Sequence, residues 1–178
     1  MKFATLFGGA GKNRESKEYK ETILIGAFLS QQGYTIKNGG YGGMMEAVSK
    51  GTTQENGKAI GITCKQVGSE VGNTFLSETV VTETLYHRLQ LLIEETTLFV
   101  VQRGGIGTLS EMFLTLDILR KDRSSDRPKV FLVGEFWIPV VEVLKKNLVP
   151  KYEHELFKVV RDFEEFKQEI VKQNENKP

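Results

Sequence analysis

Short apolar runs alternate along the chain with longer stretches in which apolar residues recur every three or four positions. The short runs are typical of buried strands, and the longer stretches are typical of helices with one apolar face. We expect strands at Lys2–Phe7, Tyr34–Lys37, Ala59–Thr63, Thr79–Val81 (a short edge strand), Leu98–Gln102, Lys129–Val133 and Phe157–Val160. We expect helices at Arg14–Gln32, Met44–Glu55, Thr84–Glu95, Thr108–Arg120, Phe136–Asn147 and Phe163–Lys172. This alternation predicts an α/β fold, a Rossmann-like doubly wound parallel sheet with helices on both faces.

The predicted elements also indicate where a ligand would bind. In a doubly wound sheet, ligands gather at the carboxyl edge of the strands, where the winding direction reverses. We expect Phe3–Phe7 and Leu98–Val101 to be among the central strands, and the loops after them to flank one crevice. The 178 residues fit one domain, since domains typically contain about 100–200 residues. We assign residues 1–173 to this domain and residues 174–178 to a frayed end.

Composition narrows the class of protein. The 24 Lys and Arg residues nearly balance the 23 Asp and Glu residues and leave a formal charge of +1, whereas proteins that bind nucleic acids usually carry a basic excess. The chain contains no run near the roughly 18 consecutive apolar residues of a membrane span. Cys64 is the single cysteine, which excludes an internal disulfide and favours a reducing, cytoplasmic location. With His87 and His154 as the two histidines, the usual zinc ligand sets are not available, and we expect no metal site.

Glycine is the most informative residue type. Ten of the 18 glycines fall in three clusters: Gly8, Gly9 and Gly11; Gly39, Gly40, Gly42 and Gly43; and Gly104, Gly105 and Gly107. Each cluster follows a predicted strand and precedes a predicted helix, so its loop can approach a ligand closely while the helix offers free N–H groups. Such loops favour a phosphorylated ligand. The alternative is that the glycines serve only the tight turns.

Two familiar phosphate-binding motifs are absent. A Walker loop needs Gly-x4-Gly-Lys-Ser/Thr, but Gly11-Lys12 is followed by Asn13, and Leu6 stands where the earlier glycine belongs. The dinucleotide fingerprint G-x-G-x-x-G fails because Arg14 or Ser110 occupies its last position. ATP hydrolysis and NAD-linked redox chemistry therefore lose their main support in the sequence.

The third glycine loop carries side chains as well as glycines. It reads Gly104-Gly105-Ile106-Gly107-Thr108-Leu109-Ser110-Glu111. Thr108 could cap the helix that follows or donate to a phosphate oxygen. Glu111, three residues later, could reach back to form a capping box with Thr108, or it could act as a catalytic carboxylate. The sequence leaves both roles open.

These residues resemble the LONELY GUY (LOG) family of cytokinin-activating phosphoribohydrolases. That family carries a Pro-Gly-Gly-x-Gly-Thr-x-x-Glu signature, and this chain has Arg103-Gly104-Gly105-Ile106-Gly107-Thr108-Leu109-Ser110-Glu111. The loops at Phe7–Gly11 and Asn38–Met45 resemble the family's first and second glycine loops. The family places an arginine 23 positions before the signature glutamate, where this chain has Arg88, and a further glutamate 10 positions before that arginine, where it has Glu78.

The chain departs from the family pattern in two places. Arg103 replaces the signature proline, and of the family's Met-His-x-Arg-Lys stretch only Arg88 remains, within Leu85-Tyr86-His87-Arg88-Leu89. The segment Met44–Gly51 also resembles a sister branch of LOG-like proteins that includes molybdenum-cofactor carriers. A non-catalytic binder or carrier of a phosphorylated nucleotide or pterin is therefore the alternative to an enzyme.

The LOG resemblance implies hydrolysis of the N-glycosidic bond of a nucleoside 5′-monophosphate, of the AMP or cytokinin riboside type, to free base and ribose 5-phosphate. Glu111 would stabilise the charge that develops on the ribose, with Glu78 as a second carboxylate, and Arg88 would bind phosphate or ribose or assist the leaving base. The phosphate and nucleotide would be held by backbone groups of the three loops, namely Gly104, Gly105, Ile106, Gly107, Thr108, Gly8, Gly9, Gly40, Gly42 and Gly43. No metal or organic cofactor is required.

The resemblance also implies a homodimer or a higher homo-oligomer. The predicted helices Thr84–Glu95 and Thr108–Arg120 carry many apolar residues, namely Leu91, Leu92, Met112, Phe113 and Leu116. One sheet face would not bury all of them, whereas a two-fold helix-to-helix interface would.

Overall fold

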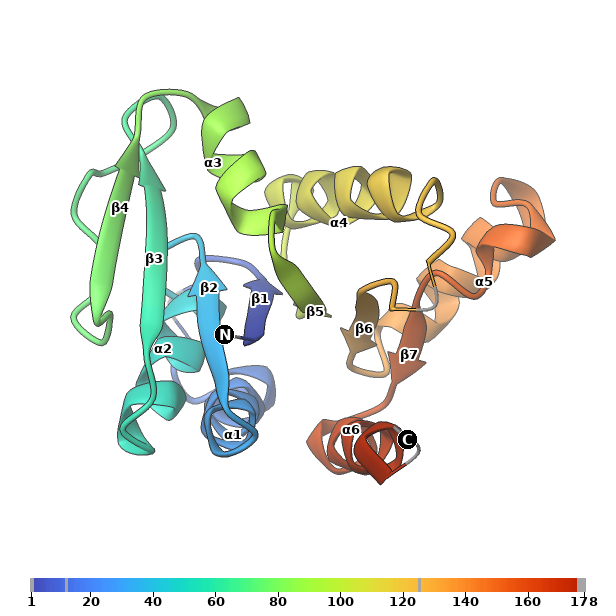
Figure 1. Ribbon diagram of the computed structural model, residues 1–178, viewed down its shortest axis with the longest axis horizontal. Helices are drawn as coiled ribbons and strands as arrows, with labels where there is room; N and C mark the ends of the chain where they lie inside the picture. Colours follow the sequence, from blue (N-terminus) through green and yellow to red (C-terminus); the bar gives the residue numbers. More distant parts are fainter. Residues whose placement is uncertain (1, 12, 125, 176–178) are drawn as a thin grey trace.

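A computed structural model of the chain describes residues 2–11, 13–124 and 126–175 (Figure 1). Its strands are β1 Lys2–Phe7, β2 Tyr34–Asn38, β3 Ala59–Cys64, β4 Glu78–Thr82, β5 Thr96–Val101, β6 Lys129–Val133 and β7 Lys158–Val160. They form one sheet in the order β4-β3-β2-β1-β5-β6-β7, and every neighbouring pair is parallel. The predicted doubly wound parallel sheet is confirmed.

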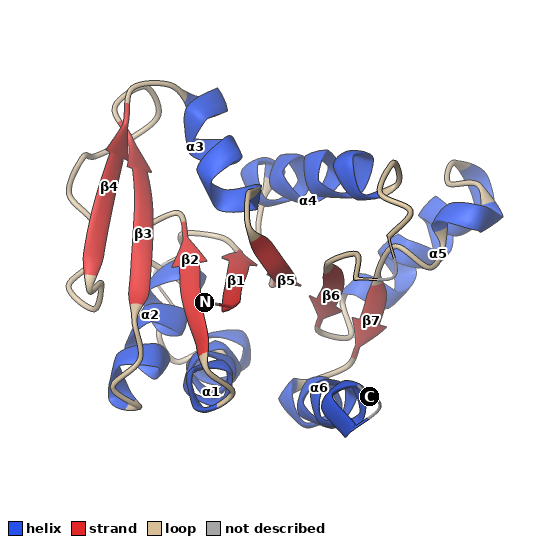
Figure 2. Cartoon of the chain, in the orientation of Figure 1, coloured by secondary structure: helices blue, strands red, loops and turns tan. Residues whose placement is uncertain are grey.

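Helices cover both faces of this sheet, as Figure 2 shows. They are α1 Lys17–Gln31, α2 Met44–Gln54, α3 Leu85–Ile93, α4 Ile106–Leu119, α5 Trp137–Asn147 and α6 Phe163–Glu175, with a short 3-10 helix, η1, at Lys151–Glu153. Side chains of α1, α2 and α6 share one buried cluster with the sheet, and side chains of α3, α4 and α5 share the other. Within the described residues, no helix is long and apolar enough to cross a membrane.

The ends of several helices differ from the sequence prediction for local reasons. Helix α1 begins three residues later than the predicted Arg14, because the Ser16 hydroxyl accepts a hydrogen bond from the Tyr19 N–H at 3.1 Å and caps the helix there. At the other end of the chain, α6 continues through Glu175. Residues 176–178 of the predicted frayed end lie outside the described residues.

The alternation of side chains along the central strands explains the two cores. In β1, Leu6 packs in the cluster with α1 and α6, whereas Phe7 packs in the cluster with α4 and α5. In β5, Val100 likewise packs in the cluster with α1 and α6, and Val101 packs in the cluster with α4 and α5. A central parallel strand is buried on both faces, so it reads in the sequence as a continuous apolar run.

The winding direction reverses between β1 and β5, which lie side by side in the middle of the sheet. Both strands end at the same edge, and the loops after them touch: the Gly9 N–H donates to the Arg103 carbonyl at 2.9 Å. The prediction that these two loops flank one crevice is therefore confirmed.

Candidate functional site

All three glycine loops meet at the carboxyl edge of the sheet. The first loop is tied to the third through Gly9 and Arg103, and its Gly9 carbonyl also accepts a hydrogen bond from the Met44 N–H, at 2.9 Å, where α2 begins. The second loop is shaped by Asn38 at the end of β2, whose Oδ1 accepts from the Gly40 N–H at 2.8 Å. These bonds fix the three loops relative to one another before any ligand binds.

Two glycines of the second loop are required by their surroundings. Gly43 has φ +64°, and a Cβ there would overlap the Gly9 carbonyl oxygen, so both its conformation and the close approach of the first loop exclude a side chain. A Cβ on Gly39 would overlap the guanidinium of Arg88. The loop therefore leaves space for an arginine 49 positions further along the chain.

Arg88 and Glu111 form the one buried ion pair that we find among the described residues. Arg88 lies on α3 and Glu111 on α4, and Arg88 Nη1 lies 3.1 Å from Glu111 Oε1. Their side chains are only 8% and 13% exposed. The arginine is held from two further directions, because its Nε donates to the Ile62 carbonyl at 2.8 Å and its guanidinium lies over the Tyr41 ring at 5.7 Å. Both groups thus occupy fixed positions.

The burial of Glu111 changes its acidity. Desolvation raises the pKa of the Glu111 carboxyl above its ordinary value, and the positive charge and hydrogen bond of Arg88 oppose this rise. A carboxylate in such surroundings is poorly hydrated. It can therefore interact strongly with a positive charge that develops beside it.

The start of α4 differs from the sequence prediction. The helix begins at Ile106 with Gly105 as its N-cap, so Thr108 is the third helical residue and does not cap the helix. The capping-box role for Glu111 is therefore wrong, and its carboxylate turns to Arg88 instead. Because no side chain caps the helix, the N–H groups of its first turn remain available to an anion.

A hollow of about 240 Å³ joins these features. It is lined by Gly8, Gly9, Ala10, Met45, Arg88, Gly105, Gly107, Thr108 and Glu111. The structure thus brings together seven of the predicted site residues, namely Gly8, Gly9, Arg88, Gly105, Gly107, Thr108 and Glu111. Glycines of the first and third loops therefore line the same hollow as the buried ion pair.

The remaining predicted glycines lie around this hollow. Gly42 and Gly43 line a neighbouring hollow with Arg14 and Glu46, and Gly104 lines another with Arg103. Gly40 is a buried residue of the second loop, and Ile106 is exposed at the start of α4.

Glu78 does not belong to the site. It is the first residue of β4, whereas the glycine loops lie at the carboxyl ends of the strands. It forms an exposed ion pair with Lys58 at 2.7 Å. The position of Glu78 along the chain matched that of the family glutamate. However, β4 runs from Glu78 to Thr82, so Glu78 lies about 13 Å along the strand from the carboxyl edge. The prediction of a second catalytic carboxylate here is wrong.

Sequence reasoning missed one residue that contacts Arg88 and another that binds the end of its helix. Tyr41 stacks on Arg88, and its hydroxyl accepts a hydrogen bond from the Cys64 N–H at 3.1 Å. Lys37 is buried and donates from Nζ to the Leu91 and Glu94 carbonyls at 2.8 and 2.6 Å, at the end of α3. The one available signal was a lysine within an apolar strand, since such a residue needs a buried partner.

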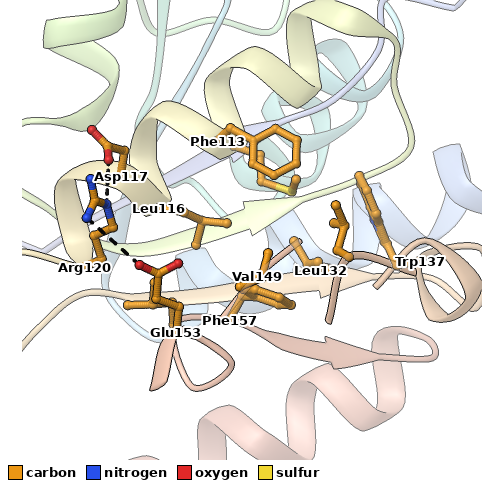
Figure 3. Close-up of a pocket in the computed structure, with 12 residues that line it drawn as sticks. Phe113, Leu116, Asp117, Arg120, Leu132, Trp137, Val149, Glu153 and Phe157 are labelled. Carbon is orange, nitrogen blue, oxygen red and sulfur yellow. Dashed lines mark hydrogen bonds and ion pairs between the residues drawn. The ribbon is translucent and has the colours of Figure 1, made fainter. Parts of the chain in front are cut away.

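An apolar cavity lies away from the glycine loops. It measures about 170 Å³ and lies between α4, α5 and β6, with Trp137, Leu116 and Phe157 among its lining residues (Figure 3). Arg120 stands at its rim, paired with Asp117 at 2.6 Å and with Glu153 at 4.0 Å. In the described part of the chain, no three histidine, cysteine or carboxylate side chains gather as they would around a metal ion.

Comparisons with known sequences point to one family. The profile of the SLOG cluster4 family matches residues 3–121, more than half of the chain. An uncharacterised protein of Archaeoglobus fulgidus is 28% identical over 126 residues, covering 71% of this chain and 81% of the relative. A protein of Mycobacterium marinum named cytokinin riboside 5′-monophosphate phosphoribohydrolase is 30% identical over 115 residues, covering 64% of this chain and 60% of the relative. A Mycobacterium tuberculosis protein of the same name is 32% identical over 91 residues, half of this chain and 49% of the relative.

Comparisons with solved structures agree on the fold. The crystal structure of TM1055 superposes with a TM-score of 0.75 at 25% identity and covers 97% of this chain and 99% of that one. A molybdenum cofactor binding protein from Rippkaea orientalis gives a TM-score of 0.74 at 20% identity, with 98% of both chains covered. The molybdenum cofactor carrier protein of Chlamydomonas reinhardtii gives 0.72 at 19% identity, over 99% of this chain and 100% of that one.

The matched residues, 3–121, include all three glycine loops together with Arg88 and Glu111. The two mycobacterial relatives carry the phosphoribohydrolase name that the resemblance implies, although this chain spans less than two thirds of the length of either. The resemblance to the LOG family is thereby confirmed, and the chain belongs to the SLOG cluster4 family.

Proposed function

We propose that this protein hydrolyses the N-glycosidic bond of a nucleoside 5′-monophosphate, of the AMP or cytokinin riboside type, to free base and ribose 5-phosphate. The observation that carries the proposal is the buried Arg88–Glu111 pair, which lines the same hollow as the uncapped start of α4. The names of the two mycobacterial relatives support the same activity.

The 5′-phosphate binds at the start of α4. The N–H groups of the first helical turn and of the Gly104–Gly107 loop point at it, and the positive end of the helix dipole favours its charge. Anchoring the phosphate there fixes the position of the ribose, so that binding energy from a group that does not react orients the group that does.

Glu111 stabilises the reacting ribose. As the bond from C1′ to the base nitrogen breaks, its electron pair leaves with the base and positive charge develops on the sugar. The poorly hydrated Glu111 carboxylate faces that charge and orients the water whose oxygen bonds to C1′. The proton lost by the water ends on the departing base. Arg88 holds the Glu111 carboxylate in place and keeps it ionised, so Arg88 is a positioning residue in this mechanism.

The second candidate is a non-catalytic carrier of a phosphorylated nucleotide or pterin. It is favoured by the solved structures of molybdenum cofactor binding and carrier proteins, which superpose over nearly the whole chain. The same loops and the same helix start would hold a phosphate of the cargo, and Glu111 would then have no reacting partner.

One experiment separates the two functions. The purified protein is incubated with purine and pyrimidine nucleoside 5′-monophosphates, and free base is followed by chromatography. Release of base from at least one of them supports the hydrolase. Binding by calorimetry without base release from any of them supports the carrier and contradicts the hydrolase.

We further propose that the chain works as a cytoplasmic homodimer built from a single domain over residues 1–173. Of the five apolar residues expected at the interface, Leu92, Met112 and Leu116 are buried in the core of the chain itself. Phe113, however, remains 44% exposed on α4, near the cavity of Figure 3. Light scattering at micromolar concentration should give the wild type twice the mass of one chain, and Phe113→Asp should reduce this to the mass of one chain. A monomeric wild type contradicts the proposal.

A further inference from the structure

A second hollow lies beside the one that contains Glu111. It measures about 500 Å³ and is lined by Gly9, Ala10, Gly11, Asn13, Ser16, Glu18, Met44, Arg103, Gly104 and Gly105. The two hollows share Gly9, Ala10 and Gly105, so both open onto the residues that precede α4. A group bound at the helix start can therefore continue from the first hollow into the second.

In the part of the chain that the structure describes, Arg103 is the cation that lines the second hollow. Its Nη1 lies 3.0 Å from Glu18 Oε1 on α1, and its guanidinium lies over the Phe136 ring at 5.5 Å. These two contacts hold the guanidinium, yet the side chain remains 66% exposed. Among the described residues, Glu18 gives it its one side-chain hydrogen bond, which leaves further N–H donors free for a ligand.

A second arginine near the loops provides a contrast. Arg14 binds Glu46 through two nitrogens, with Nε at 2.9 Å from Oε1 and Nη2 at 3.0 Å from Oε2. Its side chain is 68% exposed, almost the same as that of Arg103. Because Glu46 binds two nitrogens of the Arg14 guanidinium, Arg14 has fewer free donors for a ligand than Arg103 has.

Arg103 also stands where the LOG signature has proline. Proline has no side-chain donor and no charge, so a ligand at that position in the family meets no cation from this residue. In this chain the same position offers a fixed guanidinium, whose planar fork matches the oxygens of a phosphate. The substitution therefore adds a binding group to a site that is otherwise built from backbone donors.

We propose that Arg103 binds a second phosphate, and that the ligand of this protein is a nucleoside 5′-diphosphate, either free or esterified at its outer phosphate. The inner phosphate lies at the start of α4 and the outer one in the hollow beside Arg103. This rests on the proposed function for the placement of the inner phosphate, and it replaces the nucleoside 5′-monophosphate as the preferred ligand by the corresponding 5′-diphosphate. The diphosphate is unchanged in glycosidic cleavage: water oxygen bonds to C1′ and the base leaves, as before.

Calorimetry in magnesium-free buffer at low salt tests the proposal, with AMP, ADP and ADP-ribose as probes. The wild type is expected to bind ADP about tenfold more tightly than AMP, the scale of one charged hydrogen bond. Tight binding of ADP-ribose as well identifies an esterified ligand, whereas tight binding of ADP alone identifies a free diphosphate. Equal affinities for all three probes would overturn the proposal.

Two substitutions and a matched control locate the effect. Arg103→Ala is expected to bring the affinity for ADP down to that for AMP while changing the affinity for AMP less than twofold. Arg14→Ala removes an arginine of equal exposure that is also paired with a glutamate, and it should leave the ratio of the two affinities unchanged. If both variants reduce the ratio equally, general attraction by positive charge explains it and the proposal fails.

Glu18→Gln distinguishes ligand binding from a structural tether. If Arg103 binds the outer phosphate, removing the competing carboxylate increases the affinity for ADP. If the Arg103–Glu18 pair only holds α1 against the third loop, Glu18→Gln and Arg103→Ala weaken AMP and ADP binding alike, and the proposal is wrong. Loss of the proposed function looks different: the wild type would prefer ADP yet release no base from any probe.

Discussion

Replacing Glu111 by glutamine tests the proposed chemistry directly. Glutamine has almost the same size, and its amide oxygen can still accept a hydrogen bond from Arg88 Nη1, which lies 3.1 Å from the carboxylate. The substitution therefore removes one negative charge and little else. Since the carboxylate is 13% exposed, little water shields that charge from the ribose. Removing one preorganised electrostatic group of this kind lowers kcat by about 10²–10³, or about 2.7–4 kcal/mol of transition-state stabilisation.

The expected result is a specific loss of turnover. Release of base is expected to fall by that factor, while nucleotide affinity changes little, because the proposed phosphate donors are backbone N–H groups at the start of α4 and not the Glu111 side chain. The charge of Arg88 remains buried without its counter-ion, and breaking such a pair completely costs about 3–5 kcal/mol of stability; glutamine should lose less because it keeps the hydrogen bond. Thermal unfolding must therefore be measured beside turnover.

Asp117→Asn is the matched control for this experiment. Asp117 lies on the same helix and is likewise paired with an arginine, Arg120, but it faces the apolar cavity. Its replacement should leave base release unchanged. Turnover of Glu111→Gln within a few-fold of the wild type, with the protein still folded, would refute the catalytic role of this carboxylate.

Burial raises the pKa of Glu111, and the ionised carboxylate is the active form, so kcat should fall as the pH drops through a value above the ordinary 4.5. Arg88→Gln removes the positive charge that opposes this rise, and it should move the loss of kcat to higher pH. A pH profile of kcat over about pH 4–8 that moves to lower pH instead contradicts the assignment. Glu78→Gln should leave turnover unchanged, since Glu78 lies at the far end of β4 and pairs with Lys58; a tenfold loss in the base-release assay would return it to the site. Lys37→Met should destabilise the fold by about 2 kcal/mol in urea unfolding, because it leaves two carbonyls at the end of α3 without their donor; an unchanged midpoint would show that these hydrogen bonds contribute nothing.

The elements and their order could be predicted from the pattern of residues along the chain. Apolar periodicity depends on residues close together in the chain, and so do the glycines that end each strand. Parallel connectivity then places the ends of β1, β2 and β5 at one edge, which is why the meeting of the three glycine loops could be predicted before the structure. The family spacing further linked Arg88 to Glu111, and the structure brings them to 3.1 Å.

The partners of the charged side chains depend on the packing of the folded chain and could not be predicted in the same way. The sequence left Glu111 with two roles, a capping box with Thr108 or a catalytic carboxylate. In the structure Glu111 pairs with Arg88, and Thr108 does not cap the helix because α4 starts two residues earlier than predicted. The spacing suggested Glu78, but the direction of β4 takes it away from the site. The contact between Arg103 and Glu18 spans 85 residues. Such contacts depend on how separate helices pack against the sheet, and local pattern carries no information about that packing.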